Sequence, residues 1–168
     1  ISYSDVSEAA GDIRHLAFSS GIDDIIREAF SEGEKKLVVL ISRSSYSAED
    51  MAAAVTRVYR EDPALVPKEP LASVNMYSGT GAQRLYEISI NYGMTSEELD
   101  ARTAQLQAVD AFAELDTSGM SEAELAYAAC EYLMEHCAVS EDRSDNTAYA
   151  ALVGGRADSE GAALAYIV

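Results

Sequence analysis

Two hydrophobic periodicities follow one another along this chain, and they limit the folds it can adopt. Apolar residues recur at helical spacing from Ile22 to Phe30, whereas residues 86–92 alternate between apolar and polar side chains. A period of 3.6 residues indicates an amphipathic helix, and a period of two indicates a strand with one buried face. The sequence therefore predicts an α+β fold in which a small antiparallel sheet packs against helices.

The first half of the chain supplies the predicted sheet. Residues 37–41 form a short apolar run typical of a buried strand, and residues 71–77 and 84–92 read as a hairpin. Ser47 and Asp50 have the spacing of a capping box, which predicts a helix that begins before Met51. We expect residues 1–93 to form an α+β N-terminal domain.

The second half of the chain is predicted to be helical. Thr95 with Glu98 and Ser121 with Glu124 repeat the capping-box spacing. The first pair predicts a long helix whose apolar positions run from Leu99 to Leu115 before Gly119. The second predicts a helix that ends near Val139. Residues 94–168 are therefore expected to form a separate helical segment.

The chain is strongly acidic, with a formal net charge of −17. Such a charge disfavours nucleic acid and anionic membrane surfaces as partners, because there is no basic patch to exchange counterions with phosphates. The longest apolar run is also far shorter than the ~20 residues of a membrane-spanning helix. We expect no nucleic-acid partner and no membrane insertion, and a protein or peptide partner remains open.

The residues able to bind metals or form disulfides are few. Cys130 and Cys137 lie two helical turns apart, or ~10 Å along a helix, so we expect free thiols. His15 and His136 do not combine with them in a zinc pattern, and the paired acidic residues do not fit a calcium-binding loop. We therefore predict no metal and no cofactor.

The end of the chain is unusually apolar. Residues 159–168 read Ser-Glu-Gly-Ala-Ala-Leu-Ala-Tyr-Ile-Val, which predicts a helix with almost no polar face. A helix that is apolar all round needs a covering surface on several sides. We expect the chain to be a fragment of a longer protein, and residues 159–168 to support a homo-oligomer.

Residues 147–163 carry a resemblance to a known family. The stretch reads Thr-Ala-Tyr-Ala-Ala-Leu-Val-Gly-Gly-Arg-Ala-Asp-Ser-Glu-Gly-Ala-Ala. It resembles the nucleophile segment of bacterial transglutaminase-like proteins of the papain-type superfamily, Tyr-Gly-Ala-Leu-Val-x-Gly-x-Ala-x-Cys-x-Gly-Tyr-Ala. The resemblance implies that residues 94–168 are the truncated start of a papain-like core, and it suggests an extracellular or cell-envelope location.

The departures from the family pattern concern the catalytic position itself. Ser159 stands where the family has its catalytic cysteine, Ala150 replaces a common glycine, and Ala162 replaces a common tyrosine. In the family the histidine and aspartate of the triad follow the nucleophile helix, which would place them beyond Val168. The resemblance also implies that Tyr149, ten residues before Ser159, could line a substrate groove.

These residues leave two functions open. A papain-type nucleophile needs a thiolate beside a histidine, and a hydroxyl is far less acidic and needs a positioned base. Ser159 is therefore either a degenerate nucleophile position or a simple helix N-cap. We expect a non-catalytic member or fragment of the family that binds a protein or cell-surface partner. The alternative is the N-terminal part of an active amide hydrolase or acyl transferase.

Overall fold

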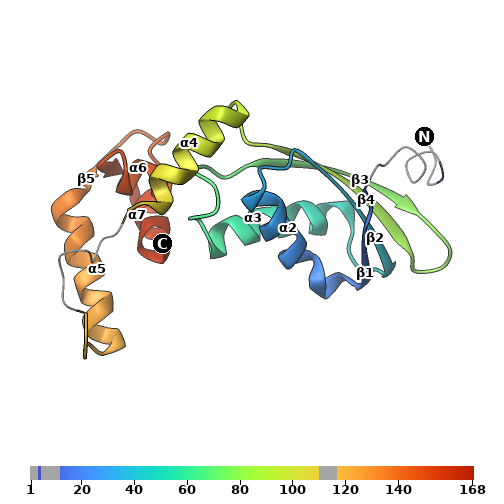
Figure 1. Ribbon diagram of the computed structural model, residues 1–168, viewed down its shortest axis with the longest axis horizontal. Coiled ribbons are helices and arrows are strands. Elements are labelled where there is room, and N and C mark those ends of the chain that lie inside the picture. Colours follow the sequence, from blue (N-terminus) through green and yellow to red (C-terminus); the bar gives the residue numbers. More distant parts are fainter. Residues whose placement is uncertain (1–3, 5–11, 110–116) are drawn as a thin grey trace. The chain divides into compact units, whose positions relative to one another are not determined.

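The computed structural model describes residue 4, residues 12–109 and residues 117–168. The chain divides into two compact units (Figure 1). The first, called the sheet unit, comprises Ile1–Tyr59 and Pro70–Thr95, and the second, called the helical unit, comprises Arg60–Glu69 and Ser96–Val168. A four-stranded sheet together with several helices confirms the predicted α+β class.

The sheet unit is built on four strands in the order β1-β2-β4-β3. β1 and β2 are parallel, whereas β2–β4 and β3–β4 are antiparallel. The predicted helix over 22–30, strand over 37–41 and hairpin over 71–92 are confirmed. The elements are β1 (Arg14–Phe18), η1 (Ser19–Gly21), α2 (Ile22–Ser31), β2 (Lys36–Arg43), α3 (Ala48–Glu61), β3 (Leu71–Ser78) and β4 (Arg84–Asn91).

The core of the sheet unit lies between strands β2 and β4 and the two helices. Leu37 pairs with Ile88 across the sheet, Val39 pairs with Tyr86, and all four side chains are buried. The helices bury the apolar face that their periodicity predicts, because burial of these side chains removes them from water. Their buried residues are Ile22, Ile25, Ile26, Ala29 and Phe30 in α2, and Met51, Ala54, Val55, Val58 and Tyr59 in α3.

Polar contacts fix the ends and the mutual position of these helices. The Asp50 amide donates to Ser47 Oγ at 3.1 Å, and the Ser47 amide donates to Asp50 Oδ2 at 2.8 Å, so the predicted capping box is present. This backbone hydrogen bond lowers the pKa of the Asp50 carboxyl. α2 is joined to α3 by an ion pair between Asp23 and Arg57, with 2.5 Å between Oδ1 and Nη2.

Strand β1 was not predicted. It has only five residues, and its sequence, Arg-His-Leu-Ala-Phe, does not alternate between apolar and polar side chains. The strand pairs with β2, and its Arg14 donates to the Ile25 carbonyl oxygen at 3.2 Å and to Glu34 Oε1 at 2.5 Å. These contacts with distant segments hold β1 at the edge of the sheet.

The helical unit contains four helices and a two-stranded parallel sheet among the residues described. α6 contacts α7, β6 and α4, and α5 contacts α6 and α7. The buried side chains here are mostly small, with Leu106 the most deeply buried of the larger ones. The elements are α4 (Ser96–Gln107), α5 (Glu122–His136), β5 (Ala138–Val139), α6 (Ala148–Leu152), β6 (Arg156–Ala157) and α7 (Ser159–Ile167).

Two predicted helix ends are wrong. The helix expected to reach Leu115 ends at Gln107, and residues 110–116 lie outside the described residues. The helix expected to end near Val139 ends at His136, because Ala138 and Val139 pair with Arg156 and Ala157 as short strands. The capping box of Ser121 and Glu124 is confirmed at the start of α5.

Within residues 12–109 and 117–168, no helix is both long enough and apolar enough to cross a membrane.

Candidate functional site

The segment that resembles a nucleophile region folds into two short helices joined by a turn and a strand. Thr147 caps α6, since its Oγ1 accepts a hydrogen bond from the Ala150 amide at 3.0 Å. Gly155 then adopts a φ of 70°, a conformation that side chains rarely tolerate. β6 follows, and α7 begins at Ser159.

Ser159 is the first residue of α7, and its side chain is exposed. The N-cap is Asp158, whose Oδ1 accepts hydrogen bonds from the Glu160 and Gly161 amides, both at 2.9 Å. The interpretation of Ser159 as an N-cap is therefore wrong. Asp and Ser are comparable N-cap residues, so the sequence offered Asp158 as an equally good candidate. The predicted cap was placed one residue too late.

The Asp158 cap alters the electrostatics of this helix start. Unsatisfied amides at a helix N-terminus carry a partial positive charge that stabilises anions. Here the Asp158 carboxylate already occupies two of those amides, and Glu160 adds a second acidic side chain beside Ser159. Arg60 approaches Glu160, with 3.5 Å between Nη2 and Oε1. Ser159 thus lies beside two carboxylates.

The first turn of α7 packs directly against the loop before α6. A β-carbon added at Gly161 would lie 2.5 Å from the carbonyl oxygen of Asp145 and 2.9 Å from the amide nitrogen of Thr147. The Asp158 amide also donates to the Asp145 carbonyl oxygen at 3.0 Å. Because both neighbours of Gly161 are backbone atoms, only glycine allows this approach.

The same loop is held by a small polar cluster. Ser140 Oγ donates to Asp145 Oδ2 at 2.5 Å, and Arg156 Nε lies 3.1 Å from the same carboxylate oxygen. The Ser140 amide donates to the Ala157 carbonyl oxygen at 2.8 Å, which continues the β5–β6 pairing. The cluster fixes the residues on both sides of α6, and so fixes the position from which α7 begins.

Tyr149 lies on α6, and its hydroxyl is engaged by α4. The hydroxyl donates to Gln105 Oε1 at 2.6 Å, and the Arg102 guanidinium carbon lies 5.6 Å from the ring centroid. The side chain is half-buried. α6 and α7 contact each other, but no hydrogen bond joins Tyr149 to Ser159 among the described residues. The contact with α4, across 44 residues of sequence, could not be predicted from local pattern.

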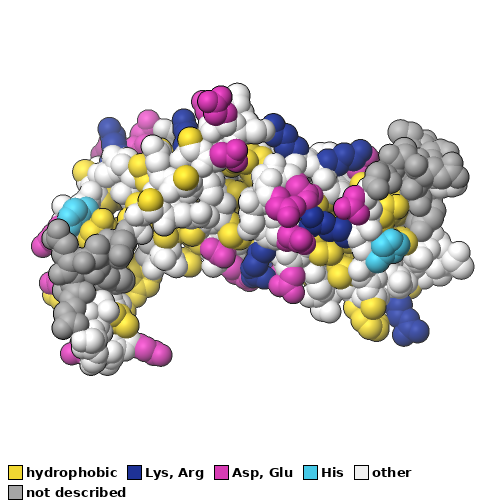
Figure 2. Space-filling view, viewed as in Figure 1, with side chains coloured by type: hydrophobic (Ala, Val, Ile, Leu, Met, Phe, Trp, Pro, Cys, Tyr) yellow, Lys and Arg dark blue, Asp and Glu magenta, His cyan; other side chains and the backbone are white. Residues whose placement is uncertain are grey.

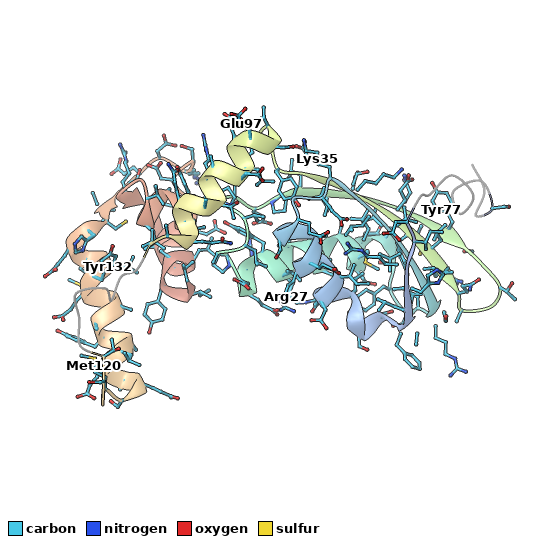
Figure 3. All side chains as sticks on the ribbon, in the orientation of Figure 1. Arg27, Lys35, Tyr77, Glu97, Met120 and Tyr132 are labelled. Carbon is cyan, nitrogen blue, oxygen red and sulfur yellow. The ribbon has the colours of Figure 1, made fainter. Side chains whose placement is uncertain are left out.

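The histidines are engaged elsewhere or lie in the other unit. The His136 ring stacks on Tyr132 with 4.2 Å between the centroids, and its Nδ1 donates to the Tyr132 carbonyl oxygen at 2.9 Å (Tyr132 is labelled in Figure 3). His15 is an exposed residue of β1 in the sheet unit. In the described part of the chain, neither histidine has a hydrogen bond to Ser159.

The cysteines are free, as expected. Cys130 is exposed on α5, and Cys137 is half-buried at the C-cap of that helix rather than within it. Burial raises the pKa of the Cys137 thiol, which lowers its reactivity. Among the described residues, no three His, Cys, Asp or Glu side chains gather in one place where they could hold a metal ion.

Comparison of the chain with known proteins finds no match. No protein-family model matches the chain, and no curated protein and no solved structure matches it either.

Proposed function

We propose that this chain is a transglutaminase-like segment that acts in protein binding and not in catalysis, with Ser159 at the family's nucleophile position. The observation that carries the non-catalytic part is the Asp158 cap, which occupies the amides at the start of α7. The family assignment is supported by the residue pattern of 147–163 and by the position of Ser159 at the start of a helix.

The chemistry explains why the cap matters. A papain-type nucleophile is activated by the positive end of a helix and by a neighbouring histidine. At Ser159 the nucleophile is a hydroxyl, a carboxylate satisfies two of the helix amides, and Glu160, which Arg60 approaches, is a second acidic neighbour. Each of these features disfavours formation of an anionic nucleophile.

A binding role is supported by the apolar side chains that remain exposed on the helical unit, namely Tyr127, Met134, Val139, Val153, Tyr166, Ile167 and Val168.

The isolated chain is expected to show no amide hydrolysis and no amine transfer, because Ser159 has no general base in hydrogen-bonding position among the described residues. The Ser159→Cys variant is expected to be equally inactive. The measurement is release of ammonia from glutamine peptides, together with incorporation of a labelled primary amine. Turnover by either protein that disappears in the Ser159→Ala variant would contradict the proposal.

The alternative function is that of an amide hydrolase or acyl transferase that receives its histidine and aspartate from further sequence. The exposed position of Ser159 at a helix start favours it, since a nucleophile must be reachable by substrate. The turnover measurement decides between the two, provided that it is repeated with the full gene product. Activity that requires Ser159 in that protein would favour the alternative.

A further inference from the structure

Helix α5 has two faces of different character. Its half-buried side chains include Leu125, Ala129 and Leu133, and the helix contacts α6 and α7. The other face carries Tyr127, which is 66% exposed, and Met134, which is 83% exposed. On the face drawn in Figure 2, hydrophobic side chains lie exposed at several places on the helical unit. A single exposed apolar residue is ordinary, but an aligned set is a feature of interaction surfaces.

The exposed apolar residues of α5 fall on one line. Ala123, Tyr127, Cys130 and Met134 are spaced by four, three and four residues, so they lie along one side of the helix and form what we call the α5 stripe. All four are exposed. This is the spacing with which one helix anchors against another.

One flank of the α5 stripe is acidic. Glu124, Glu131 and Glu135 follow the same helical spacing on the adjacent side, and all three are exposed. Glu124 belongs to the capping box with Ser121, and a hydrogen bond with Glu131 raises the pKa of the Tyr127 hydroxyl. The sequence of α5 contains four glutamates and no lysine or arginine. The stripe is thus apolar along its length and negatively charged along its edge.

We propose that the α5 stripe docks a basic amphipathic helix of a partner protein. Apolar side chains of such a helix would cover Tyr127 and Met134, and its lysine or arginine residues would face Glu131 and Glu135. Charge complementarity selects this occupant, because complementary potentials favour the encounter and like charges oppose it. A second copy of α5 would bring three more glutamates of the same kind to this edge and is disfavoured for the same reason. The inference rests on the binding role proposed above and adds the chemical class of the partner.

The test uses the full chain and a fluorescent Lys/Leu heptad peptide, with a Glu/Leu peptide of equal length for comparison. Fluorescence anisotropy at low and at moderate salt measures the Kd. The chain is expected to bind the Lys/Leu peptide, more weakly at higher salt, and not the Glu/Leu peptide. Equal binding of both peptides, or of neither, would overturn the inference.

Two pairs of variants separate the apolar and the charged contributions. Tyr127→Ser with Met134→Ser keeps the charge and is expected to weaken binding about tenfold or more, since each anchor loses buried apolar area. Glu131→Gln with Glu135→Gln is expected to weaken binding several-fold and to reduce its salt dependence. The matched control is Glu97→Gln with Asp100→Asn on α4, which removes the same charge from exposed positions elsewhere (Glu97 is labelled in Figure 3). If this control loses as much peptide affinity as the Glu131 and Glu135 variant, the peptide responds to net charge alone and the inference is overturned.

Two further measurements keep the outcomes distinct. Circular dichroism of each variant checks the fold, which the exposed positions of Tyr127 and Met134 should leave unchanged. Sedimentation of the free chain tests for self-association. If the chain forms a dimer that the Tyr127 and Met134 substitutions abolish, the occupant of the α5 stripe is a second copy and the inference is overturned. If the chain shows no turnover and does not bind the Lys/Leu peptide, only this inference is rejected. If the chain shows turnover that requires Ser159, the proposed function is rejected.

Discussion

Replacing Ile88 with alanine is expected to lower the free energy of unfolding of the sheet unit by about 3 kcal/mol. Ile88 has no exposed surface, and it stands in β4 between Leu37 of β2 and Val74 of β3. Alanine would leave a cavity in the centre of the sheet, because the neighbouring strands are fixed by their hydrogen bonds. Urea denaturation followed by circular dichroism measures the loss.

The control for this prediction lies on the neighbouring strand. Leu71 is 74% exposed on β3, so Leu71→Ala removes a similar side chain from water and not from a core. Its effect is expected to stay within about 0.5 kcal/mol. Equal destabilisation by the two substitutions would mean that Ile88 is not at the centre of the core.

The Gly161→Ala variant is expected to destabilise the helical unit by about 1 kcal/mol net. The new methyl group would come within 3 Å of the Asp145 carbonyl oxygen and the Thr147 amide nitrogen, which are backbone atoms that cannot rotate away. Alanine gains about 1 kcal/mol of helix propensity over glycine, so the clash must exceed this gain. Because overpacking of a tight contact costs 1–3 kcal/mol or somewhat more, the balance favours destabilisation.

Hydrogen exchange of the α6 and α7 amides measures this effect locally. Faster exchange is expected in Gly161→Ala and not in Ala163→Ser, which adds one atom at an exposed position of the same helix. A variant at Gly161 that exchanges as slowly as the parent would show that α7 does not approach residues 145–147 as closely as described.

The fold was predictable where one element carries its own pattern. The alternation around Ile88 predicted one buried face of β4, although Leu85 on the opposite face is buried as well, and the spacing of Ile22 to Phe30 predicted α2. β1 was missed because five residues with no alternation carry too little signal, and β5 and β6 have only two residues each. These strands exist through pairing with distant segments, which local sequence does not encode.

The candidate site was predictable only in part. The start of α7 at Ser159 follows from the polar residues before an apolar run, but the capping residue is Asp158. The hydroxyl of Tyr149 bonds to Gln105, and Gly161 packs on Asp145, so both positions depend on contacts across many residues. A resemblance in sequence identifies a position, whereas its electrostatics depend on the residues that the fold brings beside it.

The most direct test of the non-catalytic assignment is the reactivity of a thiol placed at position 159. In the Ser159→Cys variant, alkylation by iodoacetamide can be followed by mass spectrometry, with exposed Cys130 of the same molecule as the reference. Because the Asp158 carboxylate occupies two amides at the start of α7, Cys at 159 is expected to react at neutral pH no faster than Cys130. Adding Asp158→Asn, which keeps a cap but removes the charge, is expected to raise the rate at 159 about two- to fivefold and to leave Cys130 unchanged. A thiol at 159 that reacts much faster than Cys130 at pH 6, with Asp158 intact, would contradict the account.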